Sequence, residues 1–230
     1  MNDQPPADIQ LLPPPETGVW RLDKQGAGLT YDLFRADDAA HRGGNRWSTS
    51  RCGVLYCSSH QDACYAEELV ALRVHPDFEL DARQDWQDAN EPAPHVIVRD
   101  WTSKRTMLRL EVPKYCRFLD VDDDITLKVL TARLSSRLAE LGVDEQPLTS
   151  AHTRGSDRRI TRAITEWTLD QQTPEGSPRI HGITYRSNYA QRQCWAIYES
   201  TPVKVLETSY VYPESPPLLN VSREYRLRVL

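Results

Sequence analysis

The sequence predicts an α+β domain with a strand-rich core and about three helices. Three observations support this fold class. Runs typical of strands outnumber helical segments, and the two kinds alternate irregularly instead of repeating a βαβ unit. The 230 residues are 39% hydrophobic and 27% charged, a composition that can bury a substantial core. We therefore expect one domain from residue 18 to residue 230.

Residues 1–17 are predicted to be an extended, proline-rich lead-in. Five prolines interrupt the first 16 residues, which have neither the basic start nor the apolar stretch of a signal peptide. No later segment approaches the roughly 18 uninterrupted apolar residues of a membrane span. We expect a cytoplasmic protein without a membrane partner.

The first part of the domain predicts three strands and a helix. The strand-type runs combine β-branched, aromatic and apolar residues, and the helical periodicity begins just after the third run. The strands are expected at 19–22, 31–36 and 53–58, and the helix at 60–74.

The middle of the chain predicts three more strands and the best-defined helix. The strands are expected at 95–101, 105–112 and 115–121. Residues 125–141 form the helix, because Leu130, Leu134 and Leu138 belong to one apolar stripe and Gly142 is a natural helix end.

The last part predicts a third helix and three strands. Ile160, Ile164 and Trp167 recur on one side of a helix spanning about 156–172. The strands are expected at 182–187, 194–200 and 203–212, whereas the polar, proline-containing segments 75–94 and 213–220 are predicted to be surface connections.

Charge, cysteines and histidines exclude several classes of protein. The net charge of −5 disfavours direct nucleic-acid binding through phosphate contacts. Five cysteines without CxxC spacing favour reduced, mostly buried thiols, and no HExxH pair indicates a metal site. The glycine-rich signatures of dinucleotide-binding folds and P-loops, and the GxSxG elbow of hydrolases, are also missing.

Five polar residues stand at strand ends or beside apolar runs: Arg35, Arg46, Tyr56, Glu67 and Ser187. Each has an ordinary structural explanation. An arginine at a strand end is usually solvated, a tyrosine in a strand usually belongs to the core, and a serine after a strand usually caps a turn.

Together these residues lie in motifs that resemble the RES domain family. The matching stretches are LFR (33–35), GGNRW (43–47), GVLYCS (53–58), ACYAE (63–67), GITYRS (182–187) and CWAIYE (194–199). The family is named for an arginine, a glutamate and a serine, for which Arg35 or Arg46, Glu67 and Ser187 are the matching positions. The doubled acid Glu67-Glu68, the N-terminal extension and the polar insertion at 75–94 depart from the pattern.

The resemblance implies an ADP-ribosyltransferase-like fold and an enzyme that consumes NAD+ as a substrate rather than recycling it as a cofactor. Many members are toxins that split the nicotinamide–ribose bond by hydrolysis or phosphorolysis. An Xre-like, DNA-binding antitoxin is the implied partner, and oligomers are compatible with the family. Transfer of ADP-ribose to a protein, or a non-catalytic partner-binding module, are the alternatives.

The residue types suit this chemistry. Arg35 and Arg46 can grip a pyrophosphate bidentately, and Glu67 can stabilise the positive charge that develops on the ribose, directly or by holding a ribose hydroxyl. Tyr56 is expected at the nicotinamide ring or its ribose, and Ser187 at a ribose or phosphate. No metal is required.

The two neighbouring acids are expected to point in different directions. Adjacent helical residues lie about 100° apart, so only one of them can face a site beside the GVLYCS strand. We assign Glu67 to the site because it ends the ACYAE motif, and Glu68 to the exposed helix surface.

Overall fold

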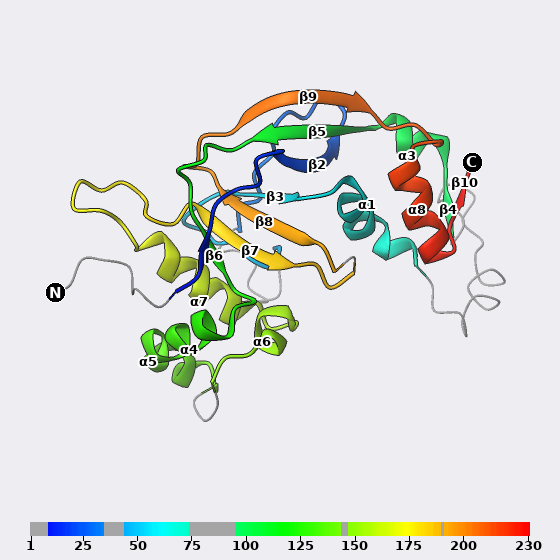
Figure 1. Cartoon of the computed structure of the whole chain (residues 1–230). Helices are drawn as coiled ribbons and strands as arrows, with labels where there is room; N and C mark the ends of the chain where they lie inside the picture. The colour runs from blue at the N-terminus through cyan, green and yellow to red at the C-terminus, as the bar shows by residue number, and fades with distance from the viewer. Residues whose placement is uncertain (1–8, 35–43, 74–94, 144–146, 190) are drawn as a thin grey trace.

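The computed structural model describes residues 9–34, 44–73, 95–143, 147–189 and 191–230. Its centre is an eight-stranded sheet in the order β1-β6-β7-β8-β3-β2-β5-β9 (Figure 1), in which only the neighbours β6 and β7 are parallel. The strands are β1 (Leu11–Leu12), β2 (Val19–Lys24), β3 (Val54–Ser58), β5 (Arg105–Glu111), β6 (Phe118–Asp120), β7 (Gly182–Arg186), β8 (Gln193–Tyr198) and β9 (Lys204–Tyr210). A separate parallel pair joins β4 (Val96–Ile97) to β10 (Arg228–Val229).

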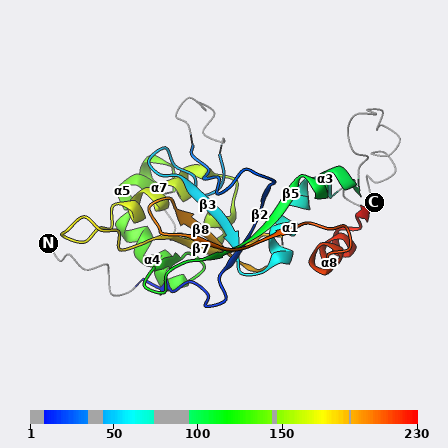
Figure 2. The ribbon, with the colours of Figure 1, turned by 90° about the horizontal axis from the view of Figure 1, so that it is seen from above.

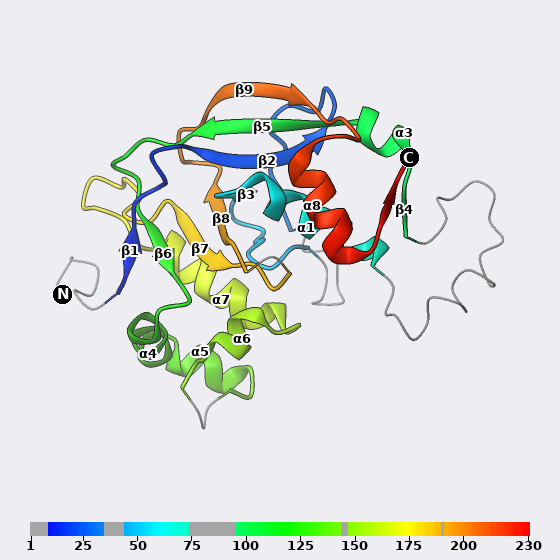
Figure 3. The same cartoon turned by 45° about the vertical axis from the view of Figure 1, so that its right-hand side comes forward.

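Two groups of helices gather at opposite ends of the sheet (Figure 2). One group contains α4 (Asp124–Arg133), α5 (Ser135–Glu140), α6 (Ser150–Arg154) and α7 (Arg158–Leu169). The other contains α1 (Gln61–Leu69), which continues into a 3₁₀ turn (Val70–Leu72), α3 (Arg99–Ser103) and α8 (Pro216–Tyr225). Figure 3 shows α8 beside α1, below the strands β2, β5 and β9.

Both helix groups cover the same face of the sheet. Successive strand residues point to opposite faces, so Tyr56 and Ser58 of β3 share one face, and Trp20 of β2 lies directly opposite Ser58. Tyr56 packs against the core of the α4–α7 group, whereas Trp20 packs against the core of the α1–α8 group. Both groups therefore adjoin β3 on this face, because Tyr56 packs against one core and α1 contacts the same strand.

The other face of the sheet encloses a third core without help from helices. Leu55, Leu110, Phe118, Trp195 and Ile197 are buried there, all from strands of the same sheet. The rings of Phe118 and Trp195 meet edge to face, with centroids 5.1 Å apart.

The α+β class and the strand-rich core are confirmed, but the expectation of about three helices is wrong. The described residues contain seven α-helices. The predicted helix 125–141 is two helices, α4 and α5, which part at Leu134, although Leu130, Leu134 and Leu138 are buried as one stripe. Helices as short as α3 and α6 span too few residues to show a periodic pattern in the sequence. Tertiary contacts supply most of their stability.

Three other segments differ from the sequence prediction. Within 31–36, only Asp32 forms an isolated bridge, to Val54, and residues 35 and 36 lie outside the described part. Most of the predicted strand 95–101 is shared between the short β4 and α3. The segment 213–220 enters α8 at Pro216, because proline is well tolerated in the first turn of a helix.

The lead-in contributes to the sheet: Leu11 and Leu12 pair with β6. The division into residues 1–17 and 18–230 stays a prediction, as does the surface role of 75–94, which lies outside the described residues. All five cysteines are free thiols, and four of them are buried, as predicted. No helix of the described segments is long and apolar enough to cross a bilayer.

Candidate functional site

Four elements meet where the two helix groups adjoin. Glu67 projects from α1, Ser187 follows the last residue of β7, Tyr56 lies in β3, and Arg46 belongs to the segment before β3. The Ser187 hydroxyl contacts Glu67 directly, and the charge of Arg46 acts on Glu67. The structure thus brings together three of the residues that the sequence predicted for the site.

Glu67 and Ser187 form the central contact. The Ser187 hydroxyl donates a hydrogen bond of 2.5 Å to Oε1 of Glu67, and the same hydroxyl oxygen accepts one of 3.0 Å from the backbone N–H of Tyr189. Ser187 is fully buried, and its own N–H donates to the carbonyl of Arg192. Because these backbone contacts fix the serine, it holds the carboxylate in one orientation.

Glu67 is an exposed residue, although protein surrounds much of its carboxyl group. The protein around it raises the pKa of Glu67 above its usual value, and the hydrogen bond from Ser187 and the charge of Arg46 oppose this shift. Glu68 points elsewhere and forms an ion pair of 2.7 Å with Arg105 at the surface. The two acids therefore diverge as predicted, although Glu67 is exposed and does not lie within the core.

Arg46 is half-buried and held by backbone carbonyls. Its Nη1 donates to the carbonyl of Thr153 at 2.6 Å and to that of Gly155 at 3.3 Å, at the end of α6. Thr161 of α7 donates its hydroxyl to the backbone carbonyl of Arg46 at 2.5 Å. Burial, followed by the charge of Arg158, lowers the pKa of Arg46 from its usual very high value.

Tyr56 supports the segment that carries Arg46. Its hydroxyl oxygen accepts a hydrogen bond of 2.9 Å from the backbone N–H of Trp47 and shares another of 3.1 Å with the Ser48 hydroxyl. Ser48 also donates to the carboxylate of Asp32. Burial raises the pKa of Tyr56 well above its ordinary value. In this arrangement the tyrosine hydroxyl fixes residues 46–48, and a contact with NAD+ stays a prediction.

A second network, which sequence reasoning missed, joins the serine segment to α6. Asp122 accepts 2.7 Å and 2.5 Å hydrogen bonds from the Arg154 side chain and from the backbone N–H of Arg186. The Asn188 side chain donates to the carbonyl of Arg154 at 3.1 Å. The end of α6 therefore positions Arg46 on one side and the residues around Ser187 on the other. No local motif marks Asp122 or Arg154 for this role.

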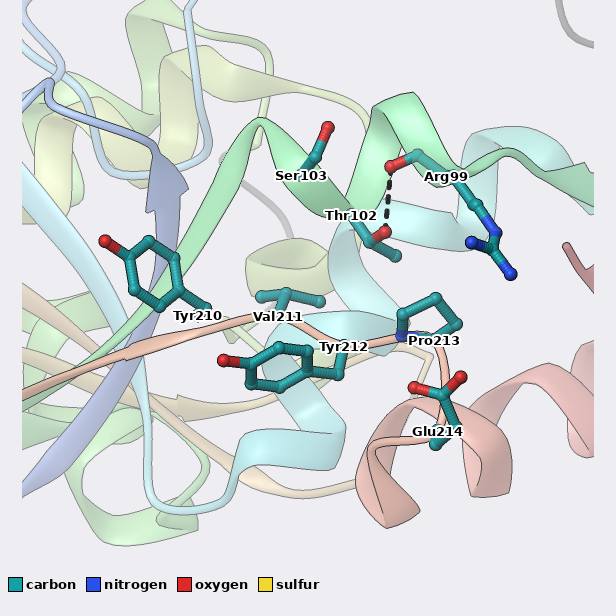
Figure 4. Close-up of a pocket in the computed structure, with 8 residues that line it drawn as sticks. All are labelled: Arg99, Thr102, Ser103, Tyr210, Val211, Tyr212, Pro213 and Glu214. Carbon is teal, nitrogen blue, oxygen red and sulfur yellow. Dashed lines mark hydrogen bonds between the residues drawn. The ribbon is translucent and has the colours of Figure 1, made fainter.

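Arg35 lies outside the described residues, so its role stays a prediction. Within the described segments, no three His, Cys, Asp or Glu side chains are grouped to hold a metal ion. A surface cavity of about 420 Å³ between α3 and residues 210–214 contains none of the predicted site residues (Figure 4).

Comparison with known proteins identifies the family. No curated protein matches the chain significantly. Among solved structures, a chain of the M. tuberculosis MbcT–MbcA toxin–antitoxin complex is similar, with 13% identity, a TM-score of 0.45, and coverage of 91% of this chain and 88% of that chain. The RES domain matches residues 18–215, a span that includes Arg46, Tyr56, Glu67 and Ser187. The chain therefore belongs to the RES domain family.

Proposed function

We propose that the protein consumes NAD+ by breaking the bond between nicotinamide and ribose. The observation that carries this proposal is the carboxylate of the exposed residue Glu67, which Ser187 orients and on which the charge of Arg46 acts. A carboxylate and a guanidinium at one site suit a substrate that develops positive charge at one carbon and carries phosphates a few atoms away.

The proposed roles follow from charge. When the glycosidic C–N bond breaks, its electron pair leaves with neutral nicotinamide, and the ribose ring becomes cationic. Glu67 stabilises that cation as it forms, and Arg46 binds the pyrophosphate. Ser187 positions Glu67 and is not the nucleophile. The acceptor then adds to the ribosyl carbon and loses a proton.

Water or inorganic phosphate is the proposed acceptor, which makes the enzyme an NAD+ glycohydrolase or phosphorylase. A protein acceptor is the alternative. Arginine-directed ADP-ribosyltransferases commonly carry an acid or amide two residues before the catalytic glutamate. Here that residue is Tyr65, which is 2% exposed and belongs to the core beneath α1. This burial disfavours that type of transferase.

Family membership also leads us to propose a toxin neutralised by a cognate antitoxin, which we expect to be Xre-like and DNA-binding. Growth of cells producing the chain with and without the neighbouring gene product tests this role. Arrest that the neighbour relieves is the expected result. Normal growth with the chain alone contradicts the toxin proposal without affecting the proposed chemistry.

The chemistry is tested by mass spectrometry of NAD+ incubated with the folded full chain, with and without inorganic phosphate. We expect free nicotinamide, accompanied by ADP-ribose for hydrolysis or ADP-ribose 1″-phosphate for phosphorolysis. ADP-ribose attached to protein would establish the transferase instead. Unchanged NAD+ would favour the remaining alternative, a non-catalytic partner-binding module.

A further inference from the structure

Two arginine side chains converge on one backbone oxygen next to the site. Nη1 of Arg46 and Nη1 of Arg158 each donate to the carbonyl of Gly155, both at 3.3 Å. Because both hydrogen bonds end on the same oxygen, the two Nη1 atoms lie close to each other. Arg158 is the first residue of α7 and is half-buried, and the Gly155 carbonyl holds its guanidinium.

Neither of these arginines has a carboxylate partner among the described residues, unlike their neighbours. Arg154 pairs with Asp122, Arg159 with Asp157, and Arg51 with Asp170, each at 2.7 Å. Two guanidinium groups close together repel each other unless an anion lies between them. These three arginines thus each contact an acid, whereas Arg46 and Arg158, beside the site, contact none among the described residues.

The charges of Glu67 and Arg158 both act on Arg46, and the charge of Arg46 acts on Glu67. The charge of Arg158 also reaches Tyr56 and Arg162. The site therefore combines one carboxylate with two guanidinium groups that share the Gly155 carbonyl.

We propose that Arg158 and Arg46 together form a phosphate-binding site, in which Arg158 is a ligand-binding residue outside the family motif. The identity of the ligand rests on the function proposed above. NAD+ suits this combination of charges, because its ribosyl carbon would face Glu67 while its pyrophosphate lies between the two arginines that share the Gly155 carbonyl. Inorganic phosphate, the acceptor in phosphorolysis, has the same chemistry and is the second source.

Equilibrium binding by calorimetry separates these sources and does not depend on turnover. The probes are ADP-ribose, which carries the pyrophosphate, and inorganic phosphate, each titrated into the full chain. Arg158→Gln removes the charge, Arg158→Lys keeps it without the fork, and Arg159→Gln is the matched control on the next residue of α7. Melting temperatures establish that each variant is folded.

We expect Arg158→Gln to weaken binding of at least one probe by about ten-fold or more, the scale of a lost charge-assisted hydrogen bond. Arg158→Lys should fall between it and the wild type, and Arg159→Gln should bind normally. Loss of ADP-ribose binding assigns the site to the dinucleotide, and loss of phosphate binding assigns it to the acceptor.

The proposal is overturned if the wild type binds neither probe, or if folded Arg158→Gln binds both normally. Should Arg158→Gln fail to fold, undiminished binding by folded Arg158→Lys also overturns it, because a phosphate held by a guanidinium fork senses its loss. A wild type that binds ADP-ribose through Arg158 but releases no nicotinamide from NAD+ would remove the proposed function and leave the phosphate site standing.

Discussion

The two helix groups cover one face of the same sheet but contribute opposite charges to the candidate site between them. The α1–α8 group presents one carboxylate, Glu67, held by a serine from beyond its own group. The α4–α7 group presents guanidinium groups, which backbone carbonyls at the end of α6 hold. A carboxylate and cations can therefore lie near one another without pairing, because Ser187 holds Glu67 and backbone carbonyls hold the arginines.

Each group also has its own apolar core. Leu130, Leu138 and Ile164 lie in one, and Leu69 and Leu218 in the other, all of them almost fully buried. Glu67, Ser187 and Arg46 belong to neither core. Stability and chemistry should therefore separate on mutation.

Leu130→Ala should lower the free energy of unfolding by about 2–5 kcal/mol, because it removes a buried side chain and leaves a cavity. Denaturant unfolding measures the loss. Turnover per folded molecule should change little, and Leu218→Ala, in the other core, should behave in the same way. Loss of turnover in the folded fraction of either variant would show that a core and the site are coupled.

Glu67→Gln should reduce nicotinamide release by about 10² or more, the scale of losing one preorganised group at a developing charge. NAD+ affinity should change little, because the lost interaction is strongest in the transition state. The protein around Glu67 raises its folded pKa, so the ionised form opposes folding at neutral pH. The melting temperature should accordingly stay the same or rise, and a marked fall would indicate a structural role instead.

Ser187→Ala should move the acidic limb of the pH–rate profile to higher pH. The serine hydrogen bond favours the ionised carboxylate, so its loss raises the pKa of Glu67 further. Because the reaction needs the ionised form, activity is then lost earlier as the pH falls. Turnover should decrease without a trapped covalent intermediate. An ADP-ribosylated Ser187 on the reaction path would make the serine a nucleophile.

Glu68→Gln should have the smallest effect. It removes a surface ion pair with Arg105, which is worth about 1 kcal/mol or less. Nicotinamide release and NAD+ affinity should match the wild type, which makes this variant the control for Glu67→Gln on the same helix. An inactive Glu68→Gln beside an active Glu67→Gln would reverse the assignment of the two acids.

The sequence by itself determined the features that depend on short-range geometry. The β-branched, aromatic and apolar runs along β3 and β8 and the apolar stripe through Leu130 and Leu138 predicted a strand-rich α+β domain. The angle between adjacent helical residues separated Glu67 from Glu68. These relations depend only on backbone geometry over a few residues, so they can be inferred without the tertiary structure.

Only the tertiary structure decided how the site is assembled. Glu67 meets Ser187 across 120 positions, and Arg46 meets Thr153 across 107. The roles of Asp122, Arg154 and Arg158 arise from the end of α6, a helix of five residues without a periodic signal. Short helices gain most of their stability from packing, and contacts between distant segments depend on the whole sheet, so neither is encoded in any local pattern.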